Sequence, residues 1–380
     1  MNITKTPVSY RLANDHGIIW WESDSLENHG HGVELELSGS DPVFVAAKTT
    51  NLSTFGRRLA NHAVYLPNLP VDSLFSIRVV GPGFRSSTVS SFRTHGPESS
   101  LRIGIINSVE GYFGSTSPGL GYALDKLGRT DRYFSCGGLV APYDDITYED
   151  WDAWYQASFN YLVDSPMLVA KSSNDAGLLS DIMMPASFPG KPFYAASIGP
   201  ARVVALDTST GGRTGFYDGS QKNWALNEFN SSDWKSAKYR IILASDPPRV
   251  TLWDQSKSYG QGTGTDRFLF KNLLPLVSQS GADLVIYGRC HSYQRGSMQS
   301  AYPNHEGSVI HHVACGGIAP AHTVSAWEWN TSEPPGIFVS SSAYHYVAVD
   351  LSPSGLSLTC RNMATDEMID ELQVEPHTLY

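Results

Sequence analysis

Short apolar segments separated by turn-forming residues run through the first 96 positions of the 380-residue chain. They are apolar throughout or alternate apolar and polar positions, and they are rich in β-branched and aromatic side chains, a composition that favours strands over helices. Segments of this kind span 17–23, 32–38, 62–70, 73–80 and 90–95. Their regular spacing predicts a small antiparallel β-sandwich over residues 1–96, with residues 95–100 as the linker that follows it.

From Leu101 onward the pattern changes to apolar strands that each run into a polar loop. Such segments lie at 101–108, 166–175, 201–209, 239–248 and 282–293. Residues 151–163 have the length and spacing of a helix. Strands with helices between some of them predict an α/β domain over residues 101–380. In such domains the chemistry gathers in the loops at the carboxyl ends of the strands.

Charge and hydropathy restrict the partners. The chain has 27 Lys and Arg against 37 Asp and Glu, a net charge of −10, which argues against nucleic acid or an anionic membrane as the main partner. No apolar run approaches the ~20 residues of a membrane-spanning helix. The first residues lack the charged start and apolar stretch of a signal peptide, which slightly favours the cytoplasm but leaves the compartment open.

Three segments, in order along the chain, resemble the purple acid phosphatases of the calcineurin-like metallophosphoesterase family. DDITYEDWDAW (144–154) is similar to that family's GDxxY loop, and FYAASIGPARVVALDTS (193–209) to its linking pair of strands. GADLVIYGRCHSYQRG (281–296) is similar to its GHxH loop and to the Tyr and Arg that follow it. The resemblance implies a fibronectin type III-like domain at 1–96. It also implies a two-sheet α/β sandwich flanked by helices at 101–380.

Most of the metal ligands that the resemblance implies are replaced in this sequence. The family holds two metal ions with seven side chains, whose positions here are Ser108, Asp145, Tyr148, Ser173 or Asn174, Ser245, Arg289 and His291. With Ser173 in the fourth place, four of the seven have changed type. The three that keep the family's type are Asp145, Tyr148 and His291, and all belong to one metal site.

Arg289 stands where the second metal site would have a histidine. A guanidinium group has five donors and no free lone pair, so it cannot coordinate a cation, and its charge repels one. It can instead hold an anion with two hydrogen bonds. We therefore expect no metal cofactor, or at most a single ion held by Asp145, Tyr148 and His291, with Glu110 or Asp246 replacing a lost carboxylate.

Three functions are compatible with this pattern. The first is a repurposed enzyme in which His291, Tyr148 and Asp145 perform acid–base chemistry without a metal. Its substrate would be a small anionic or carbonyl-bearing molecule. The residues expected to bind that substrate are Arg289, Asn174, Tyr293, Arg295, Ser108 and Ser245. The second function is a single-metal hydrolase with weak phosphoesterase activity, and the third is an inactive homologue that binds a ligand or partner.

Overall fold

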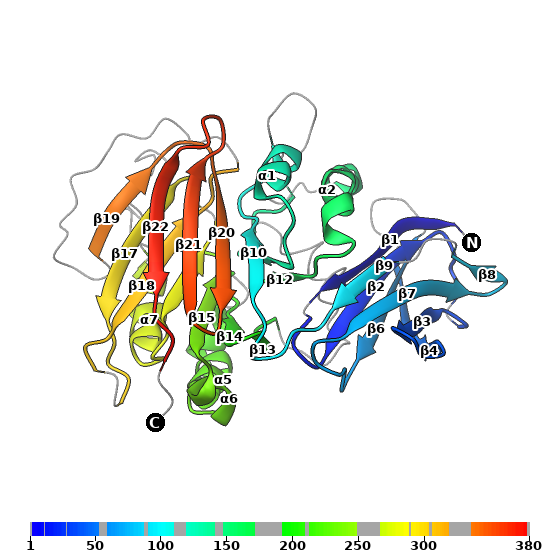
Figure 1. Ribbon diagram of the computed structural model, residues 1–380, viewed down its shortest axis with the longest axis horizontal. Helices are drawn as coiled ribbons and strands as arrows, with labels where there is room; N and C mark the ends of the chain where they lie inside the picture. Colours follow the sequence, from blue (N-terminus) through cyan, green and yellow to red (C-terminus); the bar gives the residue numbers. More distant parts are fainter. Residues whose placement is uncertain are drawn as a thin grey trace.

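A computed structural model gives the structure of most of the chain. It describes residues 2–10, 12–27, 29–52, 59–86, 90–109, 119–140, 147–171, 192–209, 213–248, 267–288, 290–303, 306–318 and 336–377. In Figure 1 these residues form two lobes, an N-terminal lobe made of strands and a larger lobe in which helices flank sheets.

The N-terminal lobe consists of strands within its described residues. These are β1 (Ile3–Tyr10), β2 (Gly17–Ser23), β3 (Gly32–Leu37), β4 (Val43–Ala46), β5 (Lys48–Leu52), β6 (Leu59–Leu66), β7 (Leu74–Gly81), β8 (Phe84–Arg85) and β9 (Ser90–Arg93). Strands β1, β2, β6 and β5 pair in one sheet, and β4, β3, β7 and β8 in another. Trp21, Val64 and Phe75 pack between the two sheets. The fibronectin type III-like topology of this lobe stays a prediction.

The larger lobe contains two sheets. Its strands are β10 (Leu101–Ile105), β11 (Arg132–Ser135), β12 (Met167–Val169), β13 (Tyr194–Ile198), β14 (Ala201–Ala205), β15 (Tyr239–Ala244), β16 (Leu284–Tyr287), β17 (Tyr293–Gln299), β18 (Val309–Cys315), β19 (Gly336–Ser341), β20 (His345–Ser352), β21 (Gly355–Asn362) and β22 (Met368–Val374). A seven-stranded sheet has the order β13-β14-β15-β16-β18-β17-β19. The other sheet contains β22-β21-β20-β10-β11-β12 and packs against it through apolar side chains of both.

Helices flank the outer faces of these two sheets. They are α1 (Leu120–Leu127), α2 (Tyr148–Leu162), α4 (Arg213–Tyr217), α5 (Ser220–Phe229), α6 (Ser232–Ser236) and α7 (Arg267–Ser278). α1 and α2 share a core with β11, β12 and β20, and α5 to α7 share a second core with the seven-stranded sheet. This mixed α/β sandwich agrees with the predicted fold class. Within the described residues, no helix is long and apolar enough to cross a membrane.

Helix α2 begins earlier than predicted because its start is capped. The Thr147 side chain accepts a hydrogen bond from the Asp150 backbone, and the Asp150 carboxylate accepts one from the Thr147 backbone at 2.9 Å. This reciprocal capping box satisfies amide groups that a helix start leaves without partners. The helix then buries Trp151, Trp154 and Tyr155 on one face.

The two lobes share a sheet. β1 pairs in parallel with β12 at Tyr10 and Met167, so the sheet of the larger lobe continues through β1, β2, β6 and β5 to ten strands. Trp20 of β2 also packs edge-on against Trp151 of α2, with ring centroids 6.0 Å apart. The lobes are therefore joined by backbone hydrogen bonds and by a common apolar core.

Candidate functional site

The loops that follow the parallel strands meet at one edge of the larger lobe. We call this edge the strand-end rim and define it by residues 106–109, 136–140, 206–209, 245–248, 288, 290–292 and 316–318. Backbone hydrogen bonds join neighbouring loops, for example Ser108 N to Gly137 O at 3.1 Å and Gly288 N to Ser245 O at 3.1 Å. Such an edge is where open α/β sheets place their sites.

Ser108 and His291 come together on this rim against Gly316. A Cβ atom on Gly316 would lie 2.7 Å from Ser108 Oγ, 2.8 Å from the His291 backbone nitrogen and 3.1 Å from that of Cys290. Only glycine fits at this position, because the first two distances are shorter than real side-chain contacts. Ser108 and His291 also have positive φ angles of 52° and 48°, which are uncommon outside glycine and recur at functional sites.

Ser245 lies on the same rim, and its hydroxyl is engaged in a buried hydrogen-bond chain. Ser245 Oγ lies 2.9 Å from Thr208 Oγ1 and donates to Asp246 Oδ2 at 2.7 Å. All three residues are at most 1% exposed. Burial also raises the pKa of the neighbouring carboxyl of Asp207, against the opposing effects of Ser209 and Lys171.

The Tyr148 hydroxyl is hydrogen-bonded to side chains of the N-terminal lobe. Its hydroxyl donates to Glu22 Oε1 at 2.6 Å and accepts from Lys5 Nζ at 2.5 Å. Lys5 Nζ also lies 3.1 Å from Glu22 Oε1 and 3.2 Å from Asp152 Oδ1. A phenol has one proton to donate, so Tyr148 would have to leave Glu22 before it could donate to a substrate.

The side chains of Tyr293 and Arg295 on β17 form hydrogen bonds to Asp370 of β22, and these bonds cross between the two packed sheets. The Tyr293 hydroxyl donates to Asp370 Oδ2 at 2.6 Å, and Arg295 holds both carboxylate oxygens at 2.5 and 2.8 Å. Burial alone would raise the pKa of Asp370, but the hydrogen bonds from Arg295 and Tyr293 outweigh it and the pKa is lowered. Both side chains thus connect the sheets, and their predicted contact with a substrate has no support in this geometry.

Several predicted site residues lie outside the described residues. They are Asp145, Asn174 with its alternative Ser173, Arg289 and Glu110. Their proposed roles stay predictions.

The described ligand positions do not fit the pair of metal ions that the resemblance implies. Ser108 and Ser245 offer neutral hydroxyls in place of a carboxylate and an imidazole, and Ser245 already donates to Asp246. The Tyr148 oxygen is bonded to the ammonium group of Lys5, which repels a cation. Among the described residues, no three His, Cys, Asp or Glu side chains are placed to hold a metal ion. A single ion would depend on Asp145, so that expectation stays a prediction.

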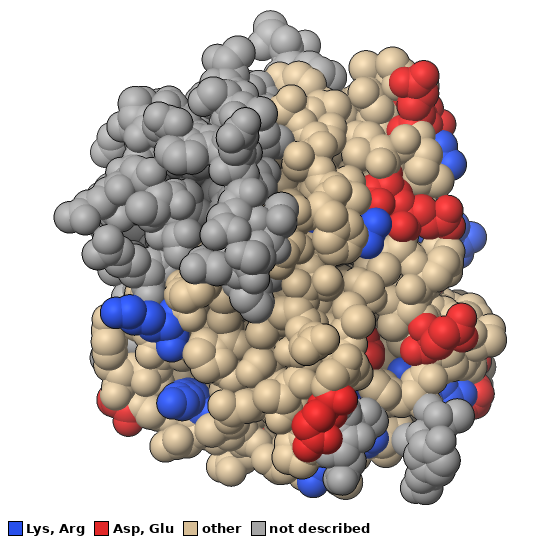
Figure 2. Space-filling view, turned by 90° about the vertical axis from the view of Figure 1, so that its left-hand side faces the viewer, with Lys and Arg blue, Asp and Glu red and all other residues tan. Residues whose placement is uncertain are grey.

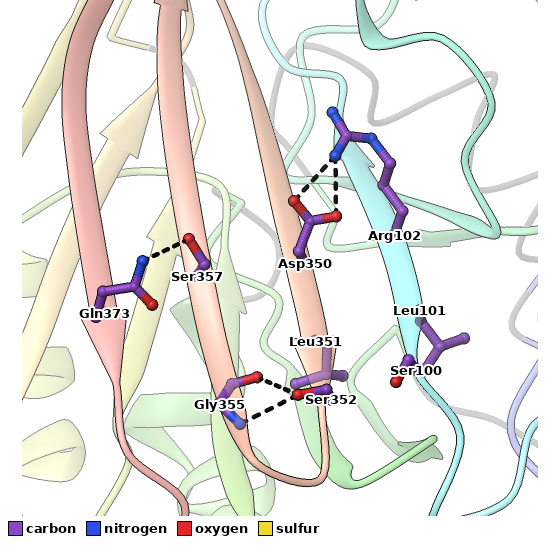
Figure 3. Close-up of a pocket in the computed structure, with 9 residues that line it drawn as sticks. All are labelled: Ser100, Leu101, Arg102, Asp350, Leu351, Ser352, Gly355, Ser357 and Gln373. Carbon is purple, nitrogen blue, oxygen red and sulfur yellow. Dashed lines mark hydrogen bonds and ion pairs between the residues drawn. The ribbon is translucent and has the colours of Figure 1, made fainter.

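A groove of about 480 Å³ lies away from the rim, beside the start of β10 and the β20–β21 hairpin (Figure 3). Its two charged side chains pair with each other, because Arg102 Nη1 lies 2.9 Å from both carboxylate oxygens of Asp350. Ser357 and Gln373 are also hydrogen-bonded to each other. Asp350 is paired with Arg102, and the other side chains that line the groove are neutral. The groove therefore offers no available side chain for acid–base chemistry and is not included in the candidate site.

Figure 2 shows the face of the molecule on the β19 side. Uncharged residues fill the centre of its described part, and acidic and basic side chains lie scattered around them. On the described part of this face, no basic patch marks an anion-binding surface.

Sequence reasoning missed Asn107 and Thr208, which form hydrogen bonds between loops of the rim. The available signal was their position, since each is a polar residue immediately or shortly after an apolar strand. Neither lies at a ligand position of the resemblance.

Comparisons with known proteins identify the fold. No family model and no curated protein matches the chain. Among solved structures it is similar to PhoD, with a TM-score of 0.63 and 12% identity, over 98% of this chain and 88% of that one. It is also similar to GAP50, described as the anchor in the inner membrane complex of Plasmodium, with a TM-score of 0.52 and 13% identity, over 74% of this chain and 90% of that one. The likeness to PhoD shows a distant phosphoesterase-like fold, while the purple acid phosphatases specifically stay a prediction.

Proposed function

We propose that this protein is a phosphoesterase-like hydrolase whose strand-end rim performs metal-independent acid–base chemistry on a small anionic or carbonyl-bearing substrate. The observation that carries the proposal is the convergence of Ser108 and His291 at Gly316. An imidazole is the side chain best suited to proton transfer near neutral pH. The Ser108 hydroxyl and the backbone nitrogens of Cys290 and His291, which lie around Gly316, are groups of the kind that stabilise negative charge on a substrate oxygen.

In this proposal His291 moves a proton to or from the substrate, and Ser108 donates a hydrogen bond to a substrate oxygen. Arg289 holds the anionic group, and Asp145 orients the imidazole ring. Tyr148, Tyr293 and Arg295 are left out, because their polar groups are bonded to Glu22 and Asp370.

The role of Arg289 is tested by anion binding without added metal. Sulfate affinity, measured by calorimetry in the presence of EDTA, should fall in Arg289→Ala by roughly 1.5–3 kcal/mol, the value of a hydrogen bond to a charged group. Arg102→Ala is the matched control, since Arg102 pairs with Asp350 at the start of β10, whereas the rim follows the end of that strand. Equal affinity in the wild type and in Arg289→Ala would remove Arg289 from the site.

The role of His291 is tested by turnover. A panel of p-nitrophenyl phosphate, bis-p-nitrophenyl phosphate and p-nitrophenyl acetate should reveal an activity that EDTA leaves unchanged. His291→Ala should lower kcat at least ~100-fold while the protein stays folded, because a general acid–base group contributes ~10²–10⁴-fold. Loss of activity in EDTA, with recovery on addition of one metal, would instead establish the single-metal hydrolase.

The second candidate function is an inactive, partner-binding homologue. The likeness to GAP50 favours it, since that protein is described as an anchor. Absence of turnover across the panel, together with unchanged sulfate binding by His291→Ala, would support this alternative over the enzyme.

A further inference from the structure

Asn107 forms hydrogen bonds to three strand ends from a single buried amide. Its Nδ2 donates to Cys315 O at 2.9 Å and to Tyr287 O at 3.3 Å, and its Oδ1 accepts from Cys136 N at 2.6 Å. Asn107 is 2% exposed and itself follows the end of β10. The amide therefore joins β10 and β11 of one sheet to β16 and β18 of the other.

Each of these contacts lies beside a residue of the candidate site. Ser108 follows Asn107, and Gly316 follows Cys315. The loop that carries His291 begins after Tyr287, and Gly137, which follows Cys136, accepts a hydrogen bond from Ser108 N. The positions of Ser108, His291 and Gly316 relative to one another thus depend on one side chain.

We infer that Asn107 is the positioning residue of the strand-end rim. It fixes the three loops on which the proposed function rests, in a protein whose described ligand positions do not fit the metal ions that would otherwise connect them. The left-handed backbones of Ser108 and His291 need such support, because strained conformations persist only where the surrounding structure holds them.

The chemistry of the amide explains why this residue is asparagine. An amide carries two N–H donors and a carbonyl acceptor on opposite sides, and all three bonds here use them. An ionised carboxylate of the same size keeps the acceptor for Cys136 N but loses both donors. It would then face two carbonyl oxygens in a buried site, where unpaired polar groups are costly. Asn107→Asp is therefore a conservative change in shape that removes the connection to β16 and β18.

The test compares Asn107→Asp with Asn61→Asp. Asn61 of β6 is also buried, at 5% exposed, and neither of its amide atoms has a hydrogen-bond partner among the described residues. Both variants bury a new carboxylate, but only the first changes the rim. Asn107→Ala replaces Asn107→Asp if the latter does not fold.

Two readouts are measured in EDTA. The first is the NMR signal of the His291 ring Cε1–H, assigned by its absence in His291→Ala, and the second is sulfate affinity. In Asn107→Asp the signal should move and the sulfate affinity should fall about 10–100-fold, as metal affinity does when a residue that orients a metal ligand is removed. Asn61→Asp should change neither.

A folded Asn107 variant with the wild-type His291 signal and sulfate affinity would overturn the inference and leave the proposed function standing. If the wild-type protein binds no sulfate, the anion-binding part of the proposed function fails. A displaced His291 signal in Asn107→Asp alone would then still support Asn107 as the positioning residue.

Discussion

Lys5 is a charged side chain with no exposed surface, held by Glu22, Tyr148 and Asp152. Lys5→Met should lower the free energy of unfolding by about 3–5 kcal/mol, since it leaves the Glu22 carboxylate buried without its cation. The double variant Lys5→Met/Glu22→Leu should recover most of that loss, because neither charge then remains. Denaturant unfolding measures both. Lys238→Met, in an exposed pair with Glu98, is the control. An equally large loss of unfolding free energy in Lys238→Met would contradict the conclusion that the burial of the Lys5–Glu22 pair causes the effect.

Tyr148 distinguishes a residue that joins the lobes from a residue of the site. Tyr148→Phe removes the hydroxyl from Glu22 and Lys5, so stability should fall by about 1–3 kcal/mol, the cost of leaving buried polar groups unsatisfied. Sulfate affinity, measured by calorimetry, should stay at the wild-type value. A clear loss of sulfate affinity would show that the hydroxyl reaches the rim and would return Tyr148 to the site.

These two residues show how far single positions can be predicted from the sequence. The spacing of residues 151–163 predicted most of the helix that Tyr148 begins, but the direction of the Tyr148 hydroxyl depends on Lys5, 143 positions away along the chain. Ser108 and His291 were predicted for one site because the resemblance places both at metal-ligand positions of that family. Asn107 was missed because its position after an apolar strand does not identify its partners, which are mainly backbone groups.

At the scale of elements, local patterns predicted some strands closely. β2 spans Gly17–Ser23, and β7 spans Leu74–Gly81 where 73–80 was expected. β1 was missed because ITKTPVSY has no apolar run and contains Pro7. It is a strand because β2 and β12 supply its partners, and its pairing with β2 is irregular between Lys5 and Val8, where a proline can be accommodated.

The contact between β17 and β22 gives a prediction about two packed elements. Arg295→Ala should lower the free energy of unfolding by about 3 kcal/mol, because Asp370 then stays buried without its cation. Sulfate affinity should be unchanged, and Arg102→Ala, from a more exposed pair, should cost less. Because the folded pKa of Asp370 is depressed, this stabilisation is present above pH ~4 and lost as the pH falls through the folded value. Wild-type stability in Arg295→Ala would contradict the interpretation.

The whole molecule should lose stability in mild acid. Burial lowers the pKa of His62 and His312 to about 3 and that of His95 and His345 to about 4. Between pH ~6.5 and these values the unfolded chain binds protons that the folded chain does not, so stability falls as the pH is lowered. Each such histidine lowers the free energy of unfolding by up to about 1.4 kcal/mol for each pH unit in this range.

Thermal melts between pH 7.5 and 5 measure this loss. His62→Gln should flatten the dependence of Tm on pH. A Tm that is constant over this range would show that the buried histidines do not control acid stability.

The sheet that runs through both lobes means that the sequence boundary near residue 96 is not a line along which the protein can be divided. Removing the N-terminal lobe would strip β1 from β12 and leave a bare edge of unpaired backbone groups, the usual starting point of aggregation. It would also uncover Trp151 of α2, which packs against Trp20. Neither region can be exchanged by itself for that of a relative, and substitutions in β1 are constrained by the larger lobe as well as by their own.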